Sequence, residues 1–80
     1  MDYIIEISGF DPKRGELRTE RKTIREAWLS EAARIADSWM EQISFAAEVS
    51  IYELPGGAFD CLASRRRRGA WEIVKRLNQV

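Results

Sequence analysis

The segment from Ser30 to Ile43 limits the fold more than any other part of the sequence, because its pattern is that of one amphipathic helix. Apolar residues recur at steps of three and four, so they form a single stripe along a helix of 3.6 residues per turn. Ser30 suits the N-cap and Glu31 suits the positive end of the helix dipole, so we expect the helix to begin at Glu31. The stripe needs a surface to cover, and the flanking segments predict a sheet. Its members are Ala32, Ala33, Ile35, Ala36, Trp39, Met40 and Ile43.

The length and charge of the chain set broad limits on what it does. Its 80 residues predict a single small domain spanning residues 1–80, with room for one core. The 13 basic and 13 acidic residues cancel, so no global field draws the protein onto nucleic acid or anionic lipid. Any such binding has to come from a local cluster of charge.

The cysteine content and the start of the chain bear on its location. Cys61 is the one cysteine in the sequence, which rules out an intramolecular disulfide and suits a reducing cytoplasm. The first ten residues lack the basic and apolar regions of a signal peptide, and no run approaches the roughly 18 apolar residues of a membrane span. We expect a soluble, cytoplasmic protein.

The segments before the helix predict a β-hairpin. Residues Tyr3 to Phe10 are rich in β-branched side chains and put Ile5 and Ile7 on one face. Asp11 to Gly15 combines Pro and Gly as turns do. The second arm, Glu16 to Trp28, carries charge on both faces, which is typical of an edge strand.

Three more strands are predicted after the helix. Glu48 to Leu54 alternates cleanly between apolar and polar residues, Ala58 to Ser64 follows a Pro-Gly-Gly turn, and Ala70 to Leu77 follows a turn that ends at Gly69. The expected fold class is α+β, with the order ββαβββ. It consists of a five-stranded antiparallel sheet with one helix packed on one face.

Catalytic signatures are missing from the sequence. It contains no histidine, which excludes Ser/His and Cys/His nucleophile pairs, and a lone Cys61 does not make a thiolate metal cluster. The glycines at positions 56 and 57 separate two strands, whereas a phosphate-binding loop precedes a helix. Asp37 and Glu41, one helical turn apart, are better explained as a solvated pair on the outer side of the helix. We therefore predict no enzymatic activity, no metal site and no cofactor.

The run of four arginines is the most distinctive local feature. Four consecutive guanidinium groups at the tip of a hairpin are expected to be exposed, with alternate members on opposite faces. They are either a solubilising turn or a basic finger that binds phosphates or an acidic protein surface. Two cations of the first turn join the finger if both turns lie at one end of the sheet. The candidate binding residues are Arg65, Arg66, Arg67, Arg68, Lys13 and Arg14.

Tyr52 is a further candidate for partner binding. It lies on the strand face opposite Val49 and Ile51, and so on the side of the sheet that the helix leaves uncovered. A partly apolar outer surface of this kind is typical of a protein interface. The three tryptophans are expected to pack in the core rather than to stack on bases. The predicted outer surface comprises Tyr52, Leu54, Leu62 and Val74.

The segment from Thr23 to Ala36 carries a resemblance to a known family. A strand that ends T-x-I, followed by L-S-E-A-x-R-I-A and a three-strand meander, resembles small phage-encoded anti-CRISPR proteins that act on type I systems. The likeness extends over residues 3–74. It implies a stoichiometric inhibitor in the bacterial host cell that docks on the Cascade surveillance complex and blocks binding of target DNA.

The resemblance also implies which partners to expect. They are subunits of type I Cascade, either the Cas7 backbone or the PAM-recognition subunit, with nonspecific contact to DNA as a further mode. The matching motif is structural, so it carries over no functional residue. Two other readings stay open: a small nucleic-acid-binding phage regulator, and a structural or adaptor protein such as an antitoxin. The balanced charge weighs against the regulator.

Overall fold

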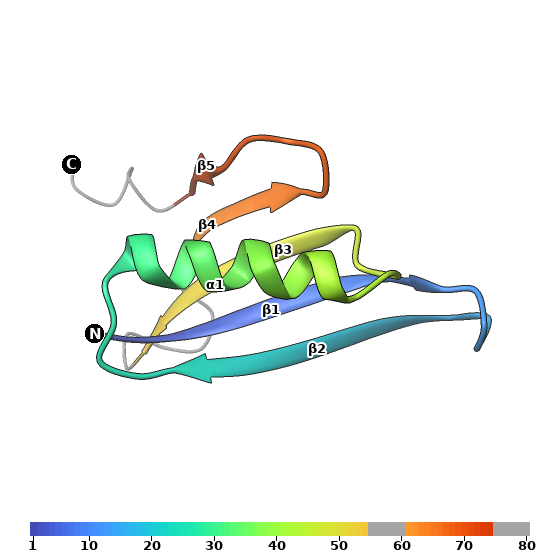
Figure 1. Ribbon diagram of the computed structural model, residues 1–80, viewed down its shortest axis with the longest axis horizontal. Coiled ribbons are helices and arrows are strands. Elements are labelled where there is room, and N and C mark those ends of the chain that lie inside the picture. The colour runs from blue at the N-terminus through green and yellow to red at the C-terminus, as the bar shows by residue number, and fades with distance from the viewer. Residues whose placement is uncertain (55–60, 75–80) are drawn as a thin grey trace.

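A computed structural model describes residues 1–54 and 61–74 of the chain. Within these residues the elements follow the predicted order ββαβββ, and the strands form one antiparallel sheet with the spatial order β2-β1-β3-β4-β5. Figure 1 shows the single helix lying across one face of this sheet, which confirms the predicted α+β architecture. The elements are β1 (Asp2–Asp11), β2 (Glu16–Ile24), α1 (Leu29–Gln42), β3 (Glu48–Leu54), β4 (Cys61–Arg66) and β5 (Glu72–Ile73).

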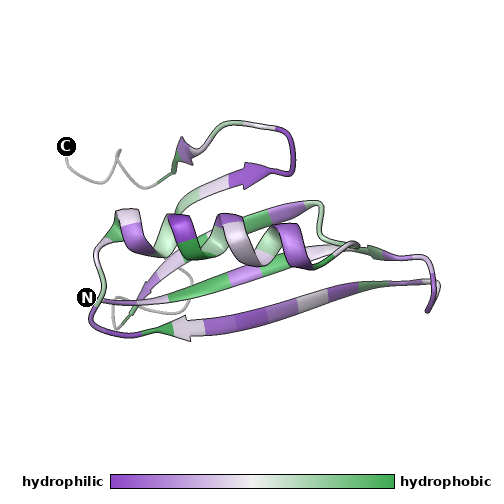
Figure 2. Cartoon of the chain, viewed as in Figure 1, coloured by the Kyte–Doolittle hydropathy of each residue, from purple (hydrophilic) through white to green (hydrophobic). Residues whose placement is uncertain are grey.

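The core lies between α1 and the two central strands, β1 and β3. Alternate residues of these strands face the helix, so Ile5 stands opposite Ile51 and Ile7 opposite Val49, and all four are fully buried. Burial of one such side chain stabilises the fold by roughly 1.5–3 kcal/mol. Figure 2 shows the apolar segments of β1 and β3 beneath the helix. The helix contributes Ala32, Ala36 and Met40 to this core.

The helix begins two residues earlier than the sequence predicted. Its N-cap is Trp28, whose extended backbone precedes the first helical residue, Leu29. The carboxylate of Glu31 accepts a hydrogen bond from the Trp28 amide at 3.1 Å, so an acidic side chain from the first turn replaces the expected serine cap. Trp28 itself is 77% exposed, which corrects its expected place in the core.

The first hairpin is long and its turn is organised by one carboxylate. Asp11 is nearly buried, and it accepts hydrogen bonds from the Lys13 amide at 3.0 Å and from the guanidinium of Arg18 at 3.0 Å. The hydrogen bond from Arg18 is the main reason why the pKa of Asp11 is lowered. Gly15 closes the turn with φ 67, a conformation that favours glycine.

The connection from α1 to β3 passes directly over β1 at Gly9. A Cβ at this position would collide with the carbonyl oxygen of Phe45, so the close approach requires glycine. The amide of Ala47 donates to the carbonyl of Ser8 at 2.8 Å, which fastens the connection to the sheet.

The C-terminal strands differ from the prediction in their bounds. β4 runs to Arg66 rather than Ser64, and β5 comprises two residues where a strand from Ala70 to Leu77 was expected. An irregularity in the β3–β4 pairing lies next to Tyr52, and Leu62 packs against the core instead of facing outward as predicted. The predicted turn at 55–57, the start of the fourth strand at 58–60 and the end of the fifth at 75–77 lie outside the described residues.

The second arm of the first hairpin is also shorter than expected. β2 ends at Ile24 rather than at Trp28. Glu26 follows with a left-handed φ of 52, and its amide donates to Asp2 at 2.9 Å. This backbone reversal ends the strand and leads the chain toward the helix.

Over the described ranges, the structure has no helix long and apolar enough to cross a membrane.

Candidate interaction surface

The first arginine of the run is used inside the fold. Arg65 points toward the helix, where its guanidinium meets Asp37 at 2.8 and 2.7 Å. Its side chain is 11% exposed and lies over the ring of Trp71, with 5.5 Å between the guanidinium carbon and the ring centroid. The expectation that all four guanidinium groups are exposed is therefore wrong for Arg65. Asp37, which lies on the helix 28 residues earlier in the sequence, neutralises the charge of Arg65 and so allows its guanidinium to be buried.

The third arginine caps the helix from outside. Arg67 donates to the carbonyl oxygens of Met40 at 2.8 Å, Ile43 at 2.7 Å and Ala46 at 2.7 Å. The last turn of α1 contains no basic residue, so Arg67 supplies both the donors and the positive charge that a helix C-terminus favours. Its role in the structure is to hold the end of the helix against the sheet.

The remaining two arginines face solvent. Arg66 and Arg68 are exposed, and among the described residues the structure shows no ion pair for either side chain. The predicted alternation is thus confirmed, since the odd-numbered members of the run turn toward the helix and the even-numbered members turn away. The basic finger is reduced to two arginines.

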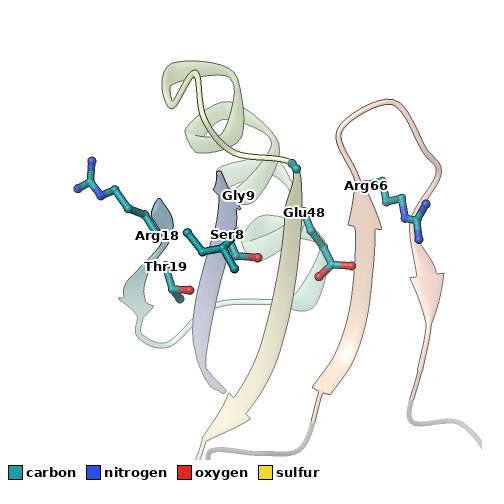
Figure 3. A pocket seen from close by; sticks show the side chains of 8 residues that line it. Ser8, Gly9, Arg18, Thr19, Glu48 and Arg66 are labelled. Carbon is teal, nitrogen blue, oxygen red and sulfur yellow. The ribbon is translucent and has the colours of Figure 1, made fainter. Parts of the chain in front are cut away.

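Arg66 borders an open groove on the reverse face, the side of the sheet that α1 does not cover. In the register of the sheet, Arg66 of β4 pairs with Glu48 of β3. Glu48 in turn pairs with Ser8 of β1, and Ser8 pairs with Thr19 of β2. These side chains thus form a row across four strands (Figure 3). The groove has a volume of about 480 Å³ and is lined by Ser8, Gly9, Leu17, Arg18, Thr19, Ala47, Glu48 and Arg66.

An exposed apolar pair adjoins the groove on the first hairpin. Phe10 and Leu17 stand opposite each other where β1 and β2 extend beyond the helix, and they are 55% and 81% exposed. Neither residue is among the binding residues predicted from the sequence. Their signal was alternation, because Phe10 has the parity of Glu6 and Ser8 and so belongs to the uncovered face. An aromatic and a leucine beside a groove are typical anchors of a protein interface.

The two basic residues of the first turn lie at the same end of the sheet as the arginine run. Figure 1 shows the β1–β2 and β4–β5 turns at one end, with the first hairpin projecting further. Lys13 and Arg14 are both exposed, and the nearest carboxylate oxygen to Arg14, on Asp11, is 3.9 Å away. Because Ser8 aligns with Arg66 through Glu48, the turn lies about three residues, or roughly 10 Å, beyond the arginines.

Tyr52 lies on the reverse face, as predicted, but it is half-buried and takes part in a small polar network. Its hydroxyl donates to Glu6 at 3.4 Å, and Glu6 also pairs with Arg21 at 2.8 Å. Burial, together with the nearby negative charge of Glu6, raises the pKa of Tyr52. Burial likewise raises the pKa of the neighbouring Cys61 thiol, which makes it a poor nucleophile.

The surface as a whole suits recognition of another macromolecule. It offers apolar anchors, exposed cations and one exposed carboxylate across adjacent strands. Among residues 1–54 and 61–74, no three side chains of the types that bind metals gather into a cluster. Comparison of the chain with protein-family models, curated proteins and solved structures gives no match in any of the three.

Proposed function

We propose that the protein is an anti-CRISPR inhibitor that binds a type I Cascade complex through its reverse face and blocks binding of target DNA. The observation that carries this proposal is the open groove between Leu17 and Arg66, on a sheet face that the helix leaves uncovered. The sequence resemblance supplies the class of partner, and the groove supplies a place for that partner to dock.

The apolar part of the surface accounts for affinity. Hot spots of protein interfaces are enriched in aromatic residues and arginine, and they lie in regions from which water is excluded. Phe10 and Leu17 are exposed, adjacent and held on a two-stranded hairpin. Insertion of this hairpin tip into a cleft between Cascade subunits would bury both side chains at little conformational cost.

The charged part accounts for how a partner is oriented. Arg66, Arg68, Lys13 and Arg14 lie at one end of the sheet, where they would face acidic side chains or the acidic backbone of DNA. Arg65 and Arg67 are excluded from this role because their donors bond within the fold. Charge at the rim of an interface mainly affects the rate of association and its dependence on salt.

The test is a pull-down of purified type I Cascade complexes with the tagged protein, followed by measurement of target-DNA binding by the recovered complex. We expect stoichiometric association and a loss of DNA binding. A double substitution of the two apolar anchors, Phe10→Ala with Leu17→Ala, should weaken association by at least about tenfold, since each hot-spot truncation costs over about 1 kcal/mol. Arg34→Ala, on the exposed side of the helix, is the matched control. Failure to bind any type I Cascade would refute the proposal.

A second candidate function is direct binding of nucleic acid, which is favoured by the four exposed cations at one end of the sheet. In that case the logarithm of DNA affinity falls linearly with the logarithm of salt concentration. Replacing Arg66 and Arg68 by alanine would reduce the slope by about 1.8, which corresponds to two phosphate contacts. A slope that does not change would rule out these arginines as the DNA contacts.

A further inference from the structure

Among residues 1–54 and 61–74, nothing pairs with the outer edge of β2. β2 is the terminal strand of the sheet and pairs on one side with β1 over nine residues, from Glu16 to Ile24. In the described part of the chain, no strand pairs with its other side. Figure 1 shows that the helix lies over the neighbouring strands and leaves this edge uncovered. Such an edge presents a row of backbone donors and acceptors to any strand that fits it.

The hydrogen bonds of β1 show which residues of β2 face outward. The carbonyl of Ser8 accepts from Ala47 on the β3 side. In an antiparallel sheet the N–H and C=O of one residue point to the same side, so both groups of Ser8 point away from its β2 partner, Thr19. Thr19 therefore directs its own N–H and C=O to the free edge, and so do Leu17 and Arg21, two residues away on either side.

The charges of β2 fit a second copy in one register. A two-fold pairing keeps side-chain faces matched, so one residue of the strand must face its own copy. With Thr19 at the axis, Arg18 faces the partner's Glu20 and Glu16 faces the partner's Lys22, and each contact occurs twice. All of these charge pairs are of opposite sign. They fall at the non-hydrogen-bonded positions of the new ladder, where side chains approach most closely.

Neighbouring registers are disfavoured by charge. With Glu20 at the axis, Glu20 meets its own copy and Arg18 meets Lys22 twice. With Arg18 at the axis, two guanidinium groups oppose each other and Glu16 meets Glu20 twice. Like charges directly opposite across strands are destabilising, so the charges on this edge favour the register centred on Thr19 over both adjacent registers.

We propose that the chain forms a two-fold dimer through antiparallel pairing of β2 with β2 of a second copy, centred on Thr19. The Thr19, Leu17 and Arg21 backbones then form about six intermolecular hydrogen bonds. Both sheets join into one continuous sheet with the two helices on the same side, and the reverse faces of both copies stay open. The intrachain ion pair between Arg18 and Glu20, at 2.8 Å, becomes part of a four-charge cluster across the axis.

The experiment is sedimentation equilibrium of the full chain over a wide range of protein concentration, with three variants. Glu16→Lys places two like-charged pairs at the interface, and we expect dimerisation at least about tenfold weaker. The charge swap Glu16→Lys with Lys22→Glu restores opposite signs and should return the dissociation constant to within about threefold of the original. Because the Thr19 amide faces outward, Thr19→Pro should abolish the dimer and leave the β1–β2 ladder intact.

Circular dichroism and thermal unfolding show whether each variant keeps the fold, and Thr19→Val is the matched control for proline because it retains the amide. If Thr19→Pro does not fold, the charge-reversal and charge-swap pair decides the question. A chain that stays monomeric up to about 1 mM would overturn the proposal, since a dissociation constant above this value corresponds to less than about 4 kcal/mol of association free energy. A dimer that neither charge reversal nor proline weakens would also overturn it.

Discussion

Replacement of Arg67 by alanine should destabilise the protein strongly, whereas the same change at its exposed neighbour Arg66 should have little effect on stability. Arg67 donates three hydrogen bonds, each between 2.7 and 2.8 Å, to carbonyl oxygens at and just after the end of the helix. Hydrogen bonds to charged groups contribute roughly 1.5–3 kcal/mol each, but one guanidinium makes all three and water replaces part of them. We therefore expect a loss of about 2–4 kcal/mol in the free energy of unfolding.

The measurement is urea unfolding followed by circular dichroism, with the slope of the transition compared among variants. For a domain of this size, the melting temperature should fall by roughly 10–25 °C. Arg66→Ala is the control, because an exposed side chain away from such contacts changes stability by within about 0.5 kcal/mol. Arg67→Lys should fall between the two, since an ammonium group retains the charge but reaches fewer carbonyls. Equal stability of the two alanine variants would refute the capping role.

Three further outcomes are expected. A double-mutant cycle on Arg65 and Asp37 should give a coupling energy of about 1 kcal/mol, because Asp37 is 48% exposed and solvent screens the pair; additive effects in urea unfolding would contradict this. In urea unfolding, Gly9→Ala should lower the free energy of unfolding by about 1–3 kcal/mol or more, because the new Cβ collides with the main chain of Phe45. Gly15→Ala should lower it by about 1 kcal/mol, because only the positive φ of that position disfavours alanine. The pKa of Asp11 is lowered by folding, so its contribution to stability is present above the ordinary pKa and is lost as pH falls through the folded-state value; an asparagine variant should show a weaker loss of stability in acid.

Local patterns in the sequence were sufficient to predict the architecture. Period-two alternation placed Ile5, Ile7, Val49 and Ile51 on the covered face, and the helical stripe identified the element that covers them. These patterns arise from burial of one face, so they appear within a few consecutive residues. The order of elements and the antiparallel sheet followed from the short connections between strands.

The errors concern features that depend on residues far apart in the chain. Arg65 is shielded from water because Asp37 is 28 residues away in sequence but adjacent in space, and neither residue alone indicates the pairing. Leu62 packs against the core rather than facing outward because the pairing of β3 with β4 is irregular beside it. Such an irregularity changes which face of the sheet the adjoining residues of the strand point to. Trp28 is the N-cap because its amide donates a hydrogen bond to the carboxylate of Glu31. This contact starts the helix before Ser30, the residue expected to cap it.

The candidate site was predicted in part. Alternation correctly separated the exposed Arg66 and Arg68 from the two arginines that face the helix, and it placed Tyr52 on the uncovered face. It did not predict the groove, whose lining residues come mainly from four strands that are spread along the sequence and adjacent in the sheet. Phe10 was treated as the end of a strand, although its parity already assigned it to that face.

The N-terminal strand occupies the middle of the sheet, between β2 and β3. Its pairing with β3 joins residues 40 to 52 positions apart, such as Ile5 and Ile51, so this central ladder can form only after β3 has been synthesised. Such non-local pairing slows folding toward milliseconds or longer. Arg67 follows β4 in the sequence, so its guanidinium can bond to the end of the helix only after the chain has been synthesised beyond β4.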